Sequence, residues 1–579
     1  MNFKHSVLSL LSIFLFLACS NPKTISVHHP TVAPYYEMVD AEFDGQKAYE
    51  TVAYVEQFFR VVGNDGFDNS IYFVENILKN EGFVEESEAT ATDRLTYRIE
   101  HRPLSKPTWQ PVSGSLSLAS GAELLNFETN RNMIAINSYS TQGAKEFEVV
   151  HITGDGRELN FETDVKGKVV FAETSVRHLF SEAVLKRGAA GVLAYRMPSY
   201  TQPEINQTSI QFSSITLDEK KQSWGLLLSY AAKNKLTEAL EAGNNRIKVN
   251  LDTDIFESEE LTIVAELKGS VYPDDRFVFS AHIQEPGAND NASGVGALAE
   301  VASTSARLLK AGKINPERTI TFLFGDEIIS TNRFIVEDEE RAKTIKWGVS
   351  LDMVGEDTEK TGGTFLIEKM PDPAAIWTRG EEKHSEWGGR PLTKDQLTPH
   401  YFNDFILNRF LEQGAAKNWV VKVNPFEGGS DHVPFLRSNI PGLLLWHFTD
   451  QFYHTDNDRI DKVSKTTLKN VGTGALVSAL LLTGDQEQAS TLVLEETTNA
   501  AINRLGVEFE LSKAEVQSGG DLDAEIDILE TWADWYIGAI GHSNDMLTHA
   551  NPEIEEAIES SKAKVTAEKE RLIQQLKSF

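Results

Sequence analysis

One stretch of this 579-residue chain places an imidazole and a carboxylate where an apolar segment ends. The apolar segment 277–281 runs directly into His282, and Asp290 lies in the Gly-rich turn that follows. A helical pattern then begins near residue 295. This order predicts a buried strand, a loop and a helix. In open α/β sheets, ligands bind in the crevice beyond the carboxyl ends of the strands.

Three further apolar segments are followed by residues of the same kind. Segment 319–324 precedes Asp326 and Glu327, and segment 347–351 precedes Asp352. Segment 442–448 is followed, five residues later, by Tyr453 and His454. If these segments are neighbouring strands of one sheet, the side chains that follow them converge on one edge.

Several carboxylates in one crevice would repel one another, and a divalent cation relieves that repulsion. Cys19 is the only cysteine, so any ligands in the folded body must be His, Asp or Glu. Oxygen and imidazole ligands without thiolate suit a catalytic rather than a structural Zn²⁺ site. Taken singly, each residue also fits a structural role, such as capping a turn, and only the joint arrangement indicates a metal site.

The segments SAHIQEPGANDNASG, FLFGDE, SLDMVG, GGSDHVPF and FYHTDND occur in this order. Together they resemble the motifs of the co-catalytic zinc aminopeptidases (peptidase family M28), which include bacterial leucyl aminopeptidases and glutamate carboxypeptidase relatives. The resemblance implies a hydrolase of peptide substrates with two Zn²⁺ ions, although other divalent ions are not excluded. In it, Asp290 bridges the two ions, His282 and Asp352 complete one site, and Glu327 and His454 complete the other.

The same resemblance makes Asp326 the general base, but the chain departs from the family here. The family base is usually Glu, and Asp is shorter by one methylene, about 1.5 Å. Misplacement by about 1 Å can cost on the order of a hundredfold in rate. Gln284 stands where the family usually has an Asp that orients the first histidine, and its oxygen is expected to accept the imidazole N–H instead.

Three further residues are predicted to contact substrate. Tyr453 precedes the last expected ligand, and His432 lies in the family motif Ser430-Asp431-His432. Arg379 lies in a long segment with little periodicity, and such loops are often functional lids.

The predicted fold is a three-layer, doubly wound mixed α/β sheet in a discontinuous peptidase domain of residues 38–126 and 256–485. Residues 127–255 contain short strands and the pattern GKVV, a helix and RGAAGVLAY, which resembles the β-rich protease-associated (PA) domain. Residues 486–579 are predicted to form a helical C-terminal region. A signal peptide over 1–19 and a linker over 20–37 precede these domains.

The N-terminus predicts export and membrane attachment. Lys4 and His5 precede a short apolar run that ends at Cys19, as in a lipoprotein signal peptide. We expect a bacterial lipoprotein, anchored through lipidated Cys19 outside the cytoplasm, in the periplasm or at the outer membrane. The net charge of −31 argues against nucleic acid as a partner. Oligomeric state cannot be inferred from the sequence.

Three hypotheses remain open at this point. The first is a lipid-anchored zinc exopeptidase, most simply an aminopeptidase. The second, motivated by Asp326 and Gln284, is a metal-binding lipoprotein that is catalytically weak and holds peptides. The third keeps the fold but changes the reaction to that of a carboxypeptidase or a glutaminyl cyclase-like enzyme.

Overall fold

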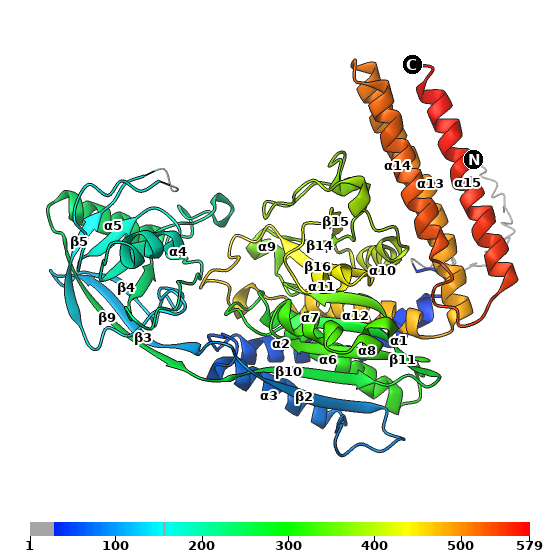
Figure 1. Ribbon diagram of the computed structural model, residues 1–579. Coiled ribbons are helices and arrows are strands. Elements are labelled where there is room, and N and C mark those ends of the chain that lie inside the picture. The colour runs from blue at the N-terminus through cyan, green and yellow to red at the C-terminus, as the bar shows by residue number, and fades with distance from the viewer. Residues whose placement is uncertain (1–27, 155–157) are drawn as a thin grey trace, which may run out of the picture.

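The computed structural model describes residues 28–154 and 158–579, which form two β-sheets and a group of C-terminal helices (Figure 1). The predicted signal peptide and Cys19 lie outside the described residues. Within the described ranges, none of the helices combines the length and apolarity that crossing a bilayer requires. The predicted mixed α/β fold is confirmed.

The larger sheet has nine strands. In spatial order they are β1 (Val84–Glu85), β2 (Leu95–Pro103), β10 (Glu259–Leu267), β12 (Arg318–Gly325), β11 (Tyr272–His282), β13 (Ile345–Leu351), β16 (Gly442–Phe448), β14 (Thr364–Glu368) and β15 (Val421–Asn424). The central strands β12, β11, β13 and β16 are mutually parallel. Their carboxyl ends therefore meet at one edge, as the sequence predicted, while β10 and β14 run antiparallel to this central group.

The central strands are apolar along most of their length because helices cover both faces of the sheet. Phe277 and Phe279 of β11 face one layer, whereas Val278 between them faces the other. The first layer is built from α1 (Ala33–Glu42), α2 (Gly45–Val55), α3 (Asp65–Asn80), α6 (Ala292–Lys310), α10 (Phe402–Lys417) and α12 (Lys465–Thr483). The second is built from α7 (Ile329–Val336), α8 (Glu339–Thr344) and α11 (His432–Arg437).

The inserted region forms a sheet of its own with seven strands. Their order is β4 (Glu123–Asn126), β3 (Thr108–Leu118), β9 (Arg246–Phe256), β5 (Lys145–His151), β6 (Val169–Ala172), β7 (Gly191–Ala194) and β8 (Trp224–Leu227). Helices α4 (Val176–Leu179) and α5 (Tyr230–Glu241) pack in the same unit. The long β3–β9 pair connects this inserted domain to the main body (Figure 1).

Two predicted boundaries are wrong. Strands β3 and β4 belong to the inserted domain, which therefore begins near residue 108 rather than at 127. Residues 33–37 are not a linker, because α1 starts at Ala33 and buries Tyr36 in the core of the main domain. Which sheet a strand joins is decided by its pairing, and local patterning does not show it.

The C-terminal region is helical, as predicted. Helices α13 (Gln486–Gln517), α14 (Leu522–Gly541) and α15 (Pro552–Leu576) pack together around an apolar core of their own. They project from the main body as adjacent rods (Figure 1).

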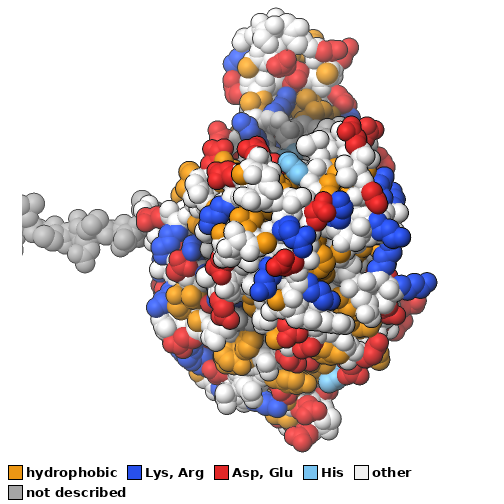
Figure 2. Space-filling model, turned by 90° about the vertical axis from the view of Figure 1, so that its left-hand side faces the viewer, with side chains coloured by type: hydrophobic (Ala, Val, Ile, Leu, Met, Phe, Trp, Pro, Cys, Tyr) orange, Lys and Arg blue, Asp and Glu red, His pale blue; other side chains and the backbone are white. Residues whose placement is uncertain are grey.

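On the face at the inserted-domain end, basic side chains lie interspersed among acidic ones (Figure 2).

Candidate metal centre

The predicted ligands gather at the carboxyl edge of the central strands. His282 is the last residue of β11, Asp352 directly follows β13, and His454 lies in the loop after β16. The His282 Nε2 atom is 3.3 Å from Asp352 Oδ1 and 3.7 Å from Asp290 Oδ1. The His454 Nε2 atom is 2.9 Å from Asp290 Oδ2. Asp290 thus lies between the two imidazoles, with one oxygen directed toward each.

These side chains form two sets of three that share Asp290. The first set is His282, Asp290 and Asp352, and within it one ligand atom from each residue lies within 4.8 Å of the others. The second set, by the same measure, is Glu285, Asp290 and His454. Four of the five predicted ligands therefore occupy positions that suit a pair of ions.

The fifth predicted ligand, Glu327, lies on the side of the first set. Its Oε1 is 3.9 Å from His282 Nε2. The carboxylate beside His454 is instead that of Glu285, whose Oε2 is 3.3 Å from His454 Nε2. The sequence reasoning missed Glu285, although it directly follows Gln284 in the loop that begins at His282.

Mutual repulsion and burial disturb the ionisation of this cluster. Burial and the Asp290 charge raise the pKa of Glu285 to about 7. Burial also raises the pKa of Glu327 well above its usual value. Burial opposes the charged form of both imidazoles, yet the neighbouring carboxylates raise the pKa of His282 and of His454 well above the ordinary value. The cluster therefore favours added positive charge.

Two buried atoms of the cluster also lack hydrogen bonds within the described part of the chain. They are His282 Nε2 and Asp352 Oδ1. Leaving buried polar atoms unsatisfied costs free energy, and a coordinated cation would satisfy both atoms at once. Imidazole nitrogen and carboxylate oxygen are donors that Zn²⁺ accepts. The residues present thus fit a divalent metal centre.

Neighbouring groups hold the bridging residue in place. The backbone N–H groups of Asn289 and Asp290 both donate to Asp458 Oδ2, and each nitrogen lies 3.0 Å from that oxygen. Asn291 caps α6 and also donates from its side chain to the carbonyl of Leu351, 3.0 Å away. The Asp290 loop is therefore tied both to the His454 loop and to the end of β13.

The inserted domain helps to position the His454 loop. The Phe212 N–H donates to the carbonyl of His454 at 3.0 Å, and the Asn132 side chain donates to the same oxygen at 3.2 Å. The Phe212 ring lies against the imidazole, with ring centres 4.5 Å apart. The adjacent Tyr453 ring also stacks on His454 at 3.7 Å. The second ligand set is thus assembled between the two domains.

A cavity of about 210 Å³ opens over the cluster. Its lining combines the acidic groups and His454 with apolar and small residues: Glu285, Asp290, Glu327, Asp352, Met353, Trp387, Gly428, Gly429, Ser430, Leu444, Trp446, Tyr453 and His454. Ser430 donates a hydrogen bond of 2.7 Å to Asp352 Oδ2. Tyr453 lines the cavity, whereas Asp326 is not among the lining residues.

Three sequence predictions differ from the structure. His432 is buried and pairs through Nε2 with Glu368 Oε1 at 2.9 Å, so it does not face the cavity. Arg379 pairs with Glu508 and Glu525 of the C-terminal helices, at 2.7 and 2.6 Å. The Gln284 side chain does not orient His282, because its oxygen accepts the Glu327 N–H.

It is the backbone carbonyl of Gln284 that lies 3.1 Å from His282 Nδ1. A backbone oxygen can accept this N–H whatever the side chain, so the Asp-to-Gln departure leaves the imidazole oriented. The burial of Asp326 and the nearby Asp431 charge raise the pKa of Asp326 to about 7.

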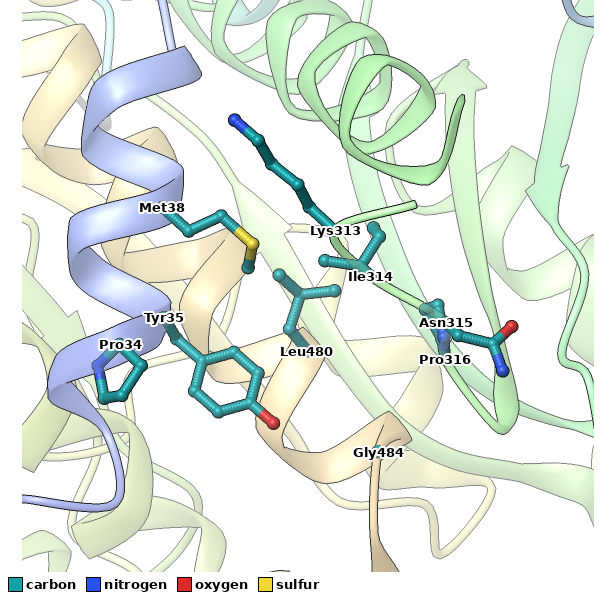
Figure 3. Close-up of a pocket in the computed structure, with 9 residues that line it drawn as sticks. All are labelled: Pro34, Tyr35, Met38, Lys313, Ile314, Asn315, Pro316, Leu480 and Gly484. Carbon is teal, nitrogen blue, oxygen red and sulfur yellow. The ribbon is translucent and has the colours of Figure 1, made fainter. Parts of the chain in front are cut away.

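A second cavity, of about 320 Å³, lies away from the cluster between α1, the loop 313–316 and the end of α12. Figure 3 shows Met38, Ile314 and Leu480 pointing toward its centre. Its lining includes Lys313 and Tyr35 as titratable groups but lacks a carboxylate or imidazole among the described residues. It does not offer the acid–base groups that the first cavity has.

Comparison with known proteins agrees with this geometry. Residues 262–479 match peptidase family M28. Aminopeptidase YwaD of Bacillus subtilis (strain 168) is 24% identical over 336 residues, which cover 55% of this chain and 63% of that protein. A probable zinc metalloprotease of Pyrenophora tritici-repentis (strain Pt-1C-BFP) is 26% identical over 261 residues, 39% of this chain and 54% of that protein. The chain spans less than two thirds of the length of these curated relatives.

Solved structures share the fold at low sequence identity. BSAP, a zinc aminopeptidase from Bacillus subtilis, has a TM-score of 0.52 at 17% identity, covering 77% of this chain and 96% of that one. A peptidase M28 precursor from Shewanella amazonensis SB2B has a TM-score of 0.54 at 15% identity, covering 79% and 96%. The matched segment 262–479 contains both ligand sets, so the similarity to peptidase family M28 covers the candidate metal centre.

Proposed function

We propose that this protein is a zinc-dependent aminopeptidase that hydrolyses the first peptide bond of peptides with a free N-terminus. One observation carries the proposal: two sets of three ligands share Asp290 at the carboxyl edge of a parallel sheet, beneath a cavity. Two similar proteins, a probable zinc metalloprotease and the zinc aminopeptidase BSAP, support the choice of metal. The cavity of about 210 Å³ is smaller than the roughly 300–1,000 Å³ of drug-sized ligand sites, which suits one terminal residue rather than an extended chain.

The residues of the site would have separate roles in the hydrolysis of an amide bond. When bound, two ions polarise the scissile carbonyl and lower the pKa of the attacking water. His282 and Asp352 would hold one ion, His454 would hold the other, and Asp290 would be shared between the two sets. Ser430 fixes the orientation of Asp352 through its hydrogen bond of 2.7 Å. A carboxylate on the turn after β12, which carries Asp326 and Glu327, takes the proton from water and passes it to the leaving amine.

The proposal extends to the setting in which the protein works. The lipoprotein-like N-terminus supports attachment through Cys19 and action outside the cytoplasm, and the PA-like pattern supports an inserted protease-associated domain. Substituting Cys19→Ala tests the anchor: the protein should move from the membrane fraction to the soluble fraction. Retention of the variant in the membrane fraction would argue against lipidation.

The activity is tested with matched peptides that differ only at their ends. The metal-free full chain, reloaded with zinc, should release the first residue from free peptides. It should release nothing from N-acetylated ones, and C-terminal amidation should not matter. Cleavage blocked by C-terminal amidation would instead indicate a carboxypeptidase. Cyclisation of N-terminal Gln without hydrolysis would indicate a glutaminyl cyclase-like enzyme.

Parallel substitutions on the turn after β12 identify the group that moves the proton. Loss of a general base typically costs about 10²–10⁴-fold in rate. Asp326→Asn should cause this loss if the family role is kept at that position, and Glu327→Gln should cause it if the role has moved. Full activity in both variants would exclude proton transfer by this turn.

A further inference from the structure

Glu285 occupies a position for which the family resemblance offers no role. We propose that Glu285, rather than Glu327, completes the ligand set on the His454 side, and that Glu327 is thereby the group that carries the proton. This inference rests on the proposed function, whose two-ion site it refines.

The distances separate the two carboxylates. Glu285 Oε2 lies 3.3 Å from His454 Nε2, and both lie with Asp290 inside one 4.8 Å ligand set. Glu327 makes its closest imidazole approach to His282, at 3.9 Å, on the other side of Asp290. Neither of the two 4.8 Å ligand sets includes Glu327.

The backbone of the loop directs Glu285 into this position. The buried Arg60 donates to the carbonyls of Ile283, at 2.7 Å, and Gly287, at 2.8 Å, and so brackets the loop. The Glu285 N–H donates to the carbonyl of Arg60 at 3.2 Å. Glu285 itself adopts a φ of 82°, a left-handed conformation that is uncommon for a residue with a side chain. Such conformations persist where surrounding contacts enforce them, often at ligand sites.

The loop also fixes Glu327 on the opposite side. The Glu327 N–H donates to Gln284 Oε1 at 2.8 Å, so adjacent residues of one loop place both carboxylates. Through this contact Gln284 positions the turn that carries Glu327, whereas an aspartate that oriented the His282 imidazole would not. It also accounts for the shorter side chain at Asp326, because a proton carried by Glu327 does not require residue 326 to reach the cavity.

Proton transfer in this arrangement is balanced as follows. The water oxygen bonds to the carbonyl carbon while Glu327 accepts a water proton. The carbon–nitrogen bond then breaks, and Glu327 returns the proton to the departing amine nitrogen. Glu327 lines the cavity where this exchange takes place, whereas Asp326 does not.

Metal binding by the full chain tests the assignment without depending on activity. Wild type, Glu285→Gln and Glu327→Gln are stripped of metal and titrated with Zn²⁺ by calorimetry and with Co²⁺ by visible absorption. Loss of a residue that merely supports a ligand typically weakens binding by about 10–100-fold, so loss of a ligand should weaken one equivalent at least that much. We expect this loss in Glu285→Gln, whereas Glu327→Gln should keep two equivalents within about tenfold of wild type. The reverse pattern, or a single equivalent in wild type, would overturn the assignment.

Anomalous diffraction from wild-type crystals grown with zinc provides a test that needs no variant. A peak about 2.0–2.2 Å from a Glu285 oxygen and from His454 supports the assignment. A peak coordinated by His454 and Glu327 refutes it. Wild type that binds two equivalents but cleaves no free peptide would refute the proposed aminopeptidase activity alone, because the ligand assignment is read from binding.

Discussion

Two buried groups of charged side chains in this molecule differ in whether their carboxylates are paired with Lys or Arg. The strand-end cluster contains four carboxylates and two imidazoles: His282, Glu285, Asp290, Glu327, Asp352 and His454. The helix-side cluster lies where the main domain meets the C-terminal helices, and it contains Lys369, Asp372, Arg379, Glu382, Arg504, Glu508 and Glu525. In the second cluster every carboxylate pairs with a Lys or an Arg. In the first, none of the described Lys or Arg side chains does so.

The difference is visible in the ionisation of one glutamate from each cluster. Burial opposes ionisation of Glu382, but Lys369 and Arg504 overcome it and lower its pKa to about 2. Burial and a neighbouring carboxylate instead raise the pKa of Glu285 to about 7. Each carboxylate of the helix-side cluster has a cation of the chain beside it, as expected of a structural cluster. The strand-end cluster has no such partner among the described Lys and Arg side chains, as expected of a site that takes up an external cation.

The strongest contrast is expected from Asp290→Asn, which removes a ligand from both sets. Loss of one supporting group typically costs about 10–100-fold, so losing the shared ligand should reduce kcat/KM by more than about a thousandfold. Peptide cleavage at saturating zinc measures the loss. The matched control is Asp458→Asn, which disturbs only the hydrogen bonds that position Asp290 and should cost about 10–100-fold. Equal effects in the two variants would contradict the bridging role.

In the helix-side cluster the largest effect should be on stability. Lys369→Met leaves Asp372 without its buried cation and Glu382 with Arg504 alone, and removing one partner of a buried pair costs about 3–5 kcal/mol. Denaturant unfolding measures the free energy, and kcat/KM of the folded protein should stay within about threefold of wild type. If activity per folded molecule fell as in Asp290→Asn, the separation between the two clusters would not hold.

Asp404, next to the helix-side cluster, should make stability depend on pH. Burial is the main cause that raises its pKa, from 3.8 to about 7. The unfolded chain releases this proton near pH 3.8, whereas the folded protein keeps it until about pH 7. Stability therefore falls as the pH rises between these values and levels off above them.

Asp404→Asn should remove that dependence. The unfolding free energy of Asp404→Asn minus that of wild type should be on the order of 2–4 kcal/mol larger at pH 8 than at pH 4. Unfolding free energies of the two proteins across this range measure it. A constant difference would show that Asp404 is ionised in the folded protein throughout.

The smallest effect on catalysis is expected from Arg379→Met. The sequence placed Arg379 at the substrate, but the structure pairs it with Glu508 and Glu525. Its loss should lower the unfolding temperature and leave KM for a free peptide within about twofold of wild type. A large rise in KM without a change in stability would restore the role that the sequence suggested.

Sequence reasoning located the side chains whose position follows from local order, and it misplaced those whose position depends on distant partners. His282 and Asp352 were predicted because each directly follows an apolar strand, and the parallel arrangement of these strands did the rest. Glu285 was missed because the orientation of its side chain depends on a left-handed backbone conformation. Contacts with Arg60, which lies 225 residues earlier in the chain, hold that conformation. No local pattern encodes that contact.

The other misplaced residues have the same explanation. Arg379 is paired by residues more than a hundred positions later, so its loop looked free in the sequence. His432 lies in a motif near the site, yet the burial of Glu368 turns it inward. Strand β3 has an ordinary strand pattern, and only its pairing with β9 shows that it belongs to the inserted domain.

The central claim is that the strand-end cluster is completed by a pair of divalent ions. It is tested most directly by measuring the zinc bound per chain after equilibrium dialysis of the metal-free protein. The account predicts about two zinc ions per wild-type chain, with most of the binding lost in Asp290→Asn. A wild-type chain that binds no zinc, manganese or cobalt under these conditions would contradict it.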